Sequence, residues 1–331
     1  MFTWNLRGSG KTACTSQTAY VIIPSKREND FWEHCISSVF LSDVCLQKAR
    51  DVKNGEEWIM LKIKEYVKVN SLEEAYELNR KKSSRVLGGM VWMKMMNRSV
   101  GTAIDLSGLG LDTVKETEDE FVIGCMTSLR TLETHAGLNA CTDGAVRESL
   151  RHIVGVQFRN CATAGGSIYG RFGFSDVLTM FLALDSYVEL YKGGRISMEE
   201  FAEKKADRDI LVNIIVKKHH QRSAYVSQRN AKTDFPVLAC AVCLDEEGMR
   251  LSIGARPGRA VLLKEKADTP VNKKDMSAGE WNRQAELLAQ KAAECVVTGS
   301  NMRASKEYRT HLVRVLTKRA LLAAGGMENG N

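Results

Sequence analysis

This sequence has little proline, no long apolar run and no leader-like start. The 331-residue chain has only 4 prolines, which excludes proline-rich linkers and collagen-like architectures. No apolar run approaches the roughly 18 to 20 residues that a membrane span needs. The N-terminus has no charged stretch followed by an apolar one, so the pattern of a secretory signal is missing. We therefore expect a cytoplasmic protein.

The cysteines show no pattern of pairs or ligands. Nine of them are scattered along the chain, and an odd, scattered count without a signal peptide favours reduced thiols over a disulfide framework. No spacing fits iron–sulfur ligands. Cys240 and Cys243 look like half a zinc knuckle. They lie in a strand pattern, however, where side chains three residues apart face opposite sides, so buried thiols are the preferred interpretation.

The charge is modest and spread out. The 47 basic residues exceed the 40 acidic ones by 7, which fits an anionic cofactor or an acidic partner but is too weak to indicate nucleic acid. No Ser-His-Asp or paired-carboxylate constellation can be assembled, so a hydrolase has little support. We expect neither a catalytic residue nor a metal site in this chain.

Residues 1–59 differ from the rest of the chain. Their apolar residues keep neither a helical nor a strand period for long, and seven basic residues balance seven acidic ones. Two explanations stay open: a genuine N-terminal extension that packs on the rest, or translated upstream DNA from a misplaced start codon. The second would fit a purine-rich, ribosome-binding-type stretch encoding residues 55–57 (GEE), which the gene's nucleotides would test.

From Met60 onward the pattern becomes regular. Alternation predicts a strand at 62–67, and a capping box at Ser71 and Glu74 predicts the start of a helix. Val146, Leu150 and Ile153 fall on one helical face. Further strands are predicted at 85–87, 100–106, 121–125 and 187–191, a short helix at 128–135, and an apolar run at 177–184.

The last third of the chain changes character. Residues 237–244 and 249–254 alternate around DEEG at 245–248, which predicts a hairpin. Residues 260–263 can add a third strand. Helical patterns occupy 277–295 and 303–324. Strands followed by helices indicate an α+β domain.

Three other motifs are weak evidence for a functional site. The GSGKT at 8–12 lacks a strand before it and the first glycine of a P-loop. The GLG at 108–110 lacks the third glycine of a dinucleotide-binding fingerprint. The basic stretch 217–222 (KKHHQR) is typical of a solvated edge, and a phosphate or partner contact there is the alternative.

Two glycine pairs are the best candidate site. One lies in residues 85–92 (RVLGGMVW) and the other in residues 159–167 (RNCATAGGS). Glycine pairs let the backbone turn with positive φ and let amide groups converge on phosphate oxygens, and Thr163 and Ser167 add hydroxyl donors. A single pair is usually a plain turn. Two such segments can hold a dinucleotide's pyrophosphate between them.

Five short motifs occur in order: LGG at 87–89, AIDLS at 103–107, IGCMT at 123–127, RNCATAGGS at 159–167, and SDVL at 175–178 followed by LALD at 182–185. In this order they resemble the motifs A-G-G-T/S, L-I-D-L-S, I-G-A-x-T, R-N-x-x-T-I-G-G-N and S/A-D-x-x-P-x-L-L-A-L-D. These belong to the FAD-binding (medium) subunits of molybdenum hydroxylases, the xanthine dehydrogenase and carbon monoxide dehydrogenase flavoprotein family. The resemblance covers the chain from Met60 onward.

The resemblance implies an α+β fold of the vanillyl-alcohol-oxidase (PCMH) type with a C-terminal three-stranded sheet plus helices. Residues 1–59 would be an uncertain extension, 60–235 an FAD-binding domain of two α+β subdomains, and 236–326 a C-terminal α+β domain. The segments 85–92 and 163–167 would wrap the pyrophosphate of FAD. Ile153 would pack near the cofactor, Asp176 would accept hydrogen bonds from its polar chain, and Leu211 would lie by the flavin ring.

The residues that the resemblance places at FAD are Arg85, Val86, Leu87, Gly88, Gly89, Met90, Val91, Trp92, Thr127, Ile153, Ala162, Thr163, Ala164, Gly165, Gly166, Ser167, Asp176 and Leu211. Three departures put the affinity for FAD, or its redox tuning, in doubt. Met90 and Val91 replace a small polar pair, and Ser167 replaces an asparagine. A lysine expected shortly after Tyr225 is missing.

The family also implies partners. A separate molybdopterin subunit hydroxylates the substrate, a [2Fe–2S] subunit relays the electrons, and reduced FAD passes them to NAD or another acceptor. This chain would then be an electron-transfer subunit of a heteromeric complex, with the basic side chains near 217–232 as one candidate contact surface. The alternative is a structural or assembly subunit that has lost its flavin. The substrate, the acceptor and the subunit stoichiometry lie beyond this sequence.

Overall fold

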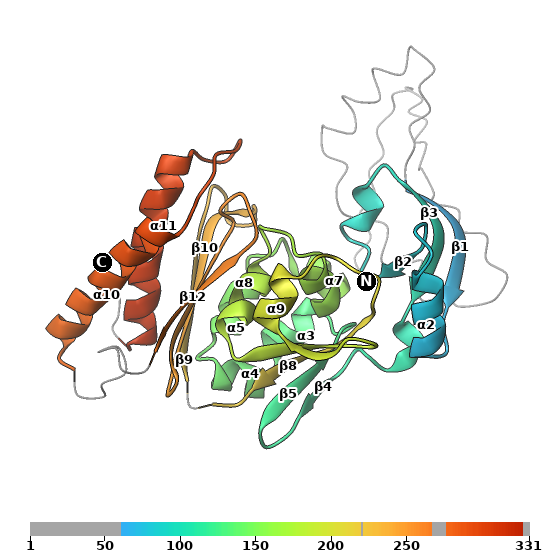
Figure 1. Cartoon of the computed structure of the whole chain (residues 1–331), viewed down its shortest axis with the longest axis horizontal. Helices are drawn as coiled ribbons and strands as arrows, with labels where there is room; N and C mark the ends of the chain where they lie inside the picture. The colour runs from blue at the N-terminus through green and yellow to red at the C-terminus, as the bar shows by residue number, and fades with distance from the viewer. Residues whose placement is uncertain (1–60, 220, 267–275, 327–331) are drawn as a thin grey trace, which may run out of the picture. The chain divides into compact units, whose positions relative to one another are not determined.

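The computed structural model describes residues 61–219, 221–266 and 276–326 of the chain (Figure 1). The expectations for residues 1–59, including the GSGKT at 8–12, lie outside the described residues, as does His220. The described elements form three sheets, each with its own helices. Within them, no helix is long and apolar enough to cross a bilayer.

The first sheet is small and parallel. Strands β1 (Lys62–Lys68), β3 (Ser99–Asp105) and β2 (Arg85–Leu87) lie in the order β1-β3-β2. Helix α2 (Leu72–Asn79) begins where it was predicted, because the Ser71 side chain accepts the amide of Glu74. Parallel strands end at a common edge of the sheet. The chain after β2, which contains the first glycine pair, therefore leaves from that edge.

The second sheet is antiparallel, in the order β4-β5-β8-β6-β7. Its strands are β4 (Val114–Glu116), β5 (Glu120–Gly124), β6 (Ser186–Leu190), β7 (Gly194–Ser197) and β8 (Leu211–Lys217). Short helices accompany it: α3 (Leu129–Thr134), α4 (Ala136–Cys141), α5 (Ala145–Leu150), α6 (Val156–Cys161), α7 (Ala164–Tyr169), α8 (Asp176–Ala183) and α9 (Met198–Glu203). Every residue of α8 is buried, which explains the apolar run in the sequence.

The third sheet has one strand more than expected. Strands β9 (Arg222–Arg229), β10 (Pro236–Asp245), β11 (Gly248–Gly254) and β12 (Val261–Lys266) pair antiparallel in the order β12-β11-β10-β9. The predicted hairpin is confirmed as β10 and β11. The fourth strand, β9, comes from residues that the sequence placed before the C-terminal domain. β9 lies at the edge of the sheet, and Tyr225 packs in the core on one face while Ala224 and Val226 pack in the core on the other.

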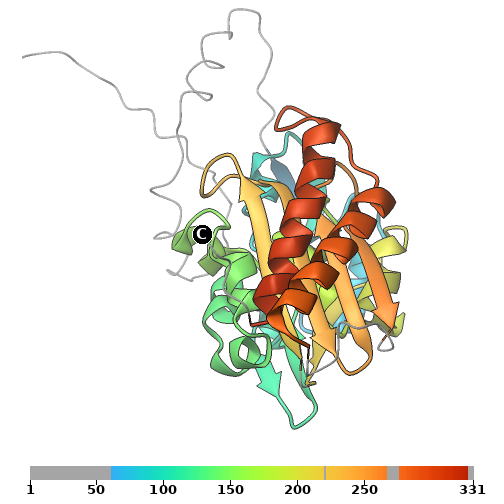
Figure 2. The same ribbon diagram turned by 90° about the vertical axis from the view of Figure 1, so that its left-hand side faces the viewer.

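Two long helices cover this sheet. Figure 2 shows α10 (Ala278–Cys295) and α11 (Lys306–Ala324) lying across its strands, and the apolar core between them holds Cys240. Cys243 belongs to the core on the opposite face, which α8 contacts. Burial raises the pKa of both thiols to about 12. The interpretation of this pair as buried thiols is therefore confirmed.

Two local predictions need correction. The helix expected to carry Ile153 ends at Leu150, and Ile153 lies in the turn after it. Val154 there has a positive φ of 51°, which breaks the helical path. The last helix begins at Lys306 rather than at 303, because Ser305 caps it.

Candidate functional site

The two glycine pairs lie against each other. We call residues 88–92 the first segment and residues 163–167 the second segment. A Cβ atom on Gly88 would stand 2.9 Å from Oγ1 of Thr163 and 3.4 Å from Cα of Gly166. A Cβ atom on Gly89 would stand only 1.6 Å from the carbonyl oxygen of Cys161. The backbones approach closely because both positions lack a side chain.

The physical role of these glycines differs from the prediction. None of the four glycines has a positive φ; in the first segment it is Met90 that does, at 55°. Gly165 and Gly166 lie inside α7 rather than in a turn, and a Cβ on Gly165 would stand 2.7 Å from the Cys125 carbonyl oxygen. The glycines therefore serve close approach, and the expectation that they supply turns with positive φ is wrong.

The backbone amides of the second segment are already used. The four at the start of α7 each donate inside the protein: Ala164 to the Thr127 carbonyl at 2.8 Å, Gly165 to the Cys125 carbonyl at 2.8 Å, Gly166 to Oγ1 of Thr163 at 3.1 Å, and Ser167 to the Thr163 carbonyl at 3.1 Å. The first two bonds fasten α7 to the end of β5 and the turn before α3, and the other two close the start of α7 on Thr163. The amides from Ala164 to Ser167 are therefore structural and are not spare for a ligand.

The amides of the first segment are different. Among the described residues, none of the amides from Gly88 to Trp92 donates a hydrogen bond to a protein acceptor. Met90 interrupts the backbone of this segment with a left-handed conformation, φ 55°. An alternation of right-handed and left-handed residues is the arrangement that turns successive amides toward one anion. Unpaired amides at the carboxyl edge of parallel strands suit an anion such as a pyrophosphate.

The hydroxyls near the two segments are mostly engaged. Oγ of Ser167 donates to the Thr163 carbonyl at 2.9 Å, and Oγ1 of Thr127 donates to the Thr113 carbonyl at 3.1 Å. Oγ1 of Thr163 accepts from Gly166 and donates to no other described residue. Of the predicted hydroxyl donors, Thr163 is thus the one whose proton stays available.

Asp176 sits in a buried ion pair that the sequence did not reveal. Its Oδ1 accepts the hydroxyl of Tyr225 and a guanidinium N–H of Arg229 at 2.6 Å. Burial raises the pKa of Asp176, and the charge of Arg229 opposes that rise. The predicted contact of Asp176 with FAD stays a prediction. Arg229, which the sequence grouped with surface cations, is its buried partner.

Leu211 and Ile153 border the main core. Leu211 is the first residue of β8 and is buried, and α7 packs against that strand. Ile153 is partly buried, and its carbonyl accepts Arg159 at 3.1 Å. Their predicted places beside the cofactor stay predictions.

The basic stretch near 217–222 is ion-paired. Lys217 binds Glu120 at 2.7 Å and Lys218 binds Glu116 at 2.8 Å. Nε2 of His219 lies 2.7 Å from a carboxylate oxygen of Asp185. These ion pairs favour a solvated edge of the protein over a partner-binding surface at the start of this stretch.

An aromatic cluster next to the first segment escaped the sequence analysis. The ring centroid of Trp92 lies 6.1 Å from that of Phe172, 5.6 Å from Phe174 and 5.7 Å from Phe235. The FGF at 172–174 was the available signal, since two phenylalanines beside a glycine in a loop are unusual for a solvated turn.

Two family models match the chain in succession. The FAD binding domain in molybdopterin dehydrogenase matches residues 61–218, and the CO dehydrogenase flavoprotein C-terminal domain matches residues 223–324. The uncharacterized protein YgfM of Escherichia coli K12 is 27% identical over 259 residues, which are 77% of this chain and 93% of that protein. The putative xanthine dehydrogenase FAD-binding subunit XdhB of the same strain is 28% identical over 204 residues, covering 53% of this chain and 65% of that protein.

Solved structures share the fold. A carbon monoxide dehydrogenase chain from Hydrogenophaga pseudoflava has a TM-score of 0.69 at 21% identity, covering 81% of this chain and 99% of its own. A chain of quinoline 2-oxidoreductase from Pseudomonas putida 86 has a TM-score of 0.68 at 18% identity, covering 80% of this chain and 98% of its own. The expected α+β fold, with its C-terminal sheet and helices, is confirmed.

Proposed function

Because this chain belongs to the family of FAD-binding subunits of molybdenum hydroxylases, we propose that it passes electrons from the [2Fe–2S] clusters of a partner subunit to NAD or another acceptor. FAD, when bound, supplies the exchange between one-electron and two-electron carriers. This chain supplies the binding site and its electrostatics.

The unpaired amides of the first segment carry the proposal. They are successive backbone donors beside the second glycine pair that the described part of the protein leaves unused, and a pyrophosphate needs such donors. The second segment supports the first, because Gly88 packs against Thr163 and Gly166, and Gly89 packs on the Cys161 carbonyl just before that segment. The site residues that the resemblance assigned to FAD are proposed on the same grounds.

Two groups next to the segments would help to hold the cofactor. The free proton of Thr163 points to a further hydrogen bond with a phosphate oxygen. The indole of Trp92, which belongs to the first segment and is held against Phe174 and Phe235, would keep water from one side of the segment. The exclusion of water strengthens each amide–anion hydrogen bond.

We propose partners of two kinds, a molybdopterin subunit that oxidises the substrate and a small iron–sulfur subunit that relays the electrons. The substrate would be chosen in the molybdopterin subunit, so this chain by itself would oxidise none. A cytoplasmic location is proposed with the complex.

The test is the flavin content of the purified full-length chain. We expect the visible absorbance of bound flavin, either as purified or after incubation with FAD. Gly89→Ala should abolish it, because the new Cβ collides with the Cys161 carbonyl and separates the segments. Gly279→Ala is the matched control, because no atom lies within 4 Å of the new Cβ and α10 is far along the chain.

The outcomes separate the candidate functions. A wild-type chain that stays colourless with excess FAD, yet copurifies with a molybdopterin subunit, would favour the flavin-less assembly subunit. Loss of flavin in the Gly279→Ala control as well would mean that the effect of Gly89→Ala is not specific to the two segments.

A further inference from the structure

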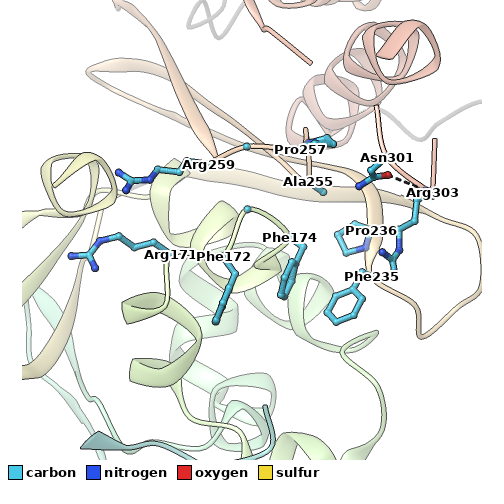
Figure 3. A pocket seen from close by; sticks show the side chains of 12 residues that line it. Arg171, Phe172, Phe174, Phe235, Pro236, Ala255, Pro257, Arg259, Asn301 and Arg303 are labelled. Carbon is cyan, nitrogen blue, oxygen red and sulfur yellow. Dashed lines mark hydrogen bonds between the residues drawn. The ribbon is translucent and has the colours of Figure 1, made fainter. Parts of the chain in front are cut away.

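A cavity lies beside the aromatic cluster. Its volume is about 420 Å³, and it lies between the loop after α7 and the loop after β11 (Figure 3). The two loops are fastened together, since the Ala255 amide donates to the Gly173 carbonyl at 2.7 Å. A Cβ on Gly173 would stand 2.1 Å from the Gly258 carbonyl oxygen. The walls are therefore already in place without a ligand, and the volume is that of a small-molecule site.

Aromatic rings form one wall of this cavity. The rings of Phe172 and Phe174 are nearly parallel, with centroids 5.2 Å apart and an interplanar angle of 11°. Phe235 packs against Phe174 at 4.5 Å. The two loop phenylalanines are only half-buried, and Figure 3 shows both rings beside the cavity. Such a wall favours a planar ring.

Positively charged side chains form the rest of the polar lining of this cavity. Arg171, Arg259 and Arg303 line the cavity, and no acidic residue among the described ones does. In Figure 3 the guanidinium groups of Arg171 and Arg259 lie at one end, while Arg303 lies at the other, beside Phe235. Of these three, Arg303 has a carboxylate partner within the described chain, Asp234 at 3.1 Å. At the first end, Arg171 lies 3.8 Å from the centroid of the Phe201 ring and Arg259 donates to the Ala202 and Glu203 carbonyls, but neither has a carboxylate partner within the described chain.

Of these residues, Arg171 gives the strongest indication of a ligand. Its side chain is only 7% exposed, its N–H groups donate to the carbonyls of Phe201 and Tyr169, and its Nη2 has no partner among the described residues. No described carboxylate lies within ion-pair distance of it, and Asp207 acts on it only from further away. Burial lowers the pKa of Arg171, and the charge of Arg259 adds to that effect. A buried cation without a counterion is costly.

We propose that this cavity binds a planar aromatic anion, with the ring against Phe172 and Phe174 and the anionic group at the end formed by Arg171 and Arg259. The ring gains stacking and burial, and the anion supplies the charge that these arginines lack. The proposal goes beyond FAD binding, because its residues lie outside the two glycine segments.

The test is isothermal titration of the purified full chain with 2-naphthoate. Naphthalene-2-methanol presents the ring without the charge, and acetate presents the charge without the ring. We expect 2-naphthoate to bind at least about tenfold more tightly than either, the scale of one charged hydrogen bond. Equal affinity for 2-naphthoate and the neutral alcohol would overturn the role of the arginines.

Variants locate the site. Arg259→Gln should weaken 2-naphthoate by about tenfold and leave the neutral alcohol unchanged. Arg283→Gln on α10 is the matched control, since it removes the same charge from another exposed arginine. Phe174→Leu should weaken both ring compounds. If Phe174→Leu does not fold, Arg259→Gln decides alone, because Arg259 is exposed and its loss leaves no buried gap.

Titration with and without saturating FAD separates this proposal from the proposed function. Binding of 2-naphthoate that persists with FAD bound supports a separate site. Displacement of 2-naphthoate by FAD would overturn it, because the cavity would then belong to the dinucleotide. A chain that binds 2-naphthoate but never FAD would contradict the proposed function and leave this inference standing.

Discussion

The two glycine segments look alike in the sequence and do opposite work in the structure. The second segment uses every amide from Ala164 to Ser167 to hold α7 in place, whereas the first leaves its amides from Gly88 to Trp92 without described acceptors. In their contact, Gly88 lies against Oγ1 of Thr163 and Cα of Gly166. A pair of glycines therefore indicates that two stretches of backbone come close, and only the hydrogen bonds tell which of them is free to bind.

The largest effect is expected from removing the ion pair that anchors the second segment, which tests its structural role. Arg159, just before it, binds the buried Glu133 through two N–H···O bonds of 2.8 and 3.2 Å, and Arg130 adds a third contact at 2.9 Å. Glu133→Gln should cost about 3–5 kcal/mol of unfolding free energy, because it leaves a buried guanidinium without its counter-charge. Urea denaturation measures the loss.

The control for Glu133→Gln is Glu148→Gln, whose partner Arg151 is largely exposed. That substitution should change the free energy of unfolding by less than about 1 kcal/mol. If both variants lose the same stability, the buried pair does not anchor the second segment, and the comparison fails.

The same pair predicts a pH dependence. Burial alone would raise the pKa of Glu133, but its bonds to Arg159 and Arg130 outweigh burial and hold the pKa below its ordinary value of 4.5. The folded chain then binds fewer protons than the unfolded chain as the pH falls below that value. The stability from this group is therefore present above about pH 4.5 and is lost below it. Denaturation curves between about pH 3 and 6 should show a shallower dependence on pH for Glu133→Gln than for the wild type.

Much of this arrangement could be predicted from the sequence, and the limits have physical causes. The sequence predicted that the two glycine pairs lie near each other, with a pyrophosphate between them; it did not predict their direct contact. The use of the Ala164 and Gly165 amides was not predicted either, because their acceptors, the Thr127 and Cys125 carbonyls, come from a distant part of the chain. Local patterns carry no record of such long-range hydrogen bonds.

Arg229 and β9 are two more features that local sequence patterns did not reveal. A cation beside other cations indicates a solvated surface, yet Arg229 is the buried partner of Asp176. The strand that carries it pairs with β10 and extends the expected three-stranded sheet to four. Its polar residues hid the strand, because only a few apolar residues pack its two faces, Tyr225 on one and Ala224 and Val226 on the other.

A smaller loss of stability is expected when the hydroxyl of Thr163 is removed. Its Oγ1 caps α7 by accepting the Gly166 amide at 3.1 Å. Thr163→Val keeps the shape but removes the acceptor, so we expect a loss of about 1 kcal/mol in thermal or urea unfolding. Thr163→Ser should restore most of it. Equal stability of the valine and serine variants would mean that the hydroxyl does not support the second segment.

The smallest expected effect concerns Met90, the residue of the first segment with φ of 55°. Met90→Gly removes the strain of a side chain in the left-handed region but adds freedom to the unfolded chain, so the net change should stay within about 1 kcal/mol. Flavin content should be unchanged, since the glycine keeps the amide that we propose binds phosphate. Val91→Gly is the control: Val91 has no positive φ, so it has no such strain to relieve and should lose stability instead. If Met90→Gly lost its flavin while Val91→Gly kept it, the Met90 side chain would hold the cofactor, and the amides would not account for the difference between the two segments.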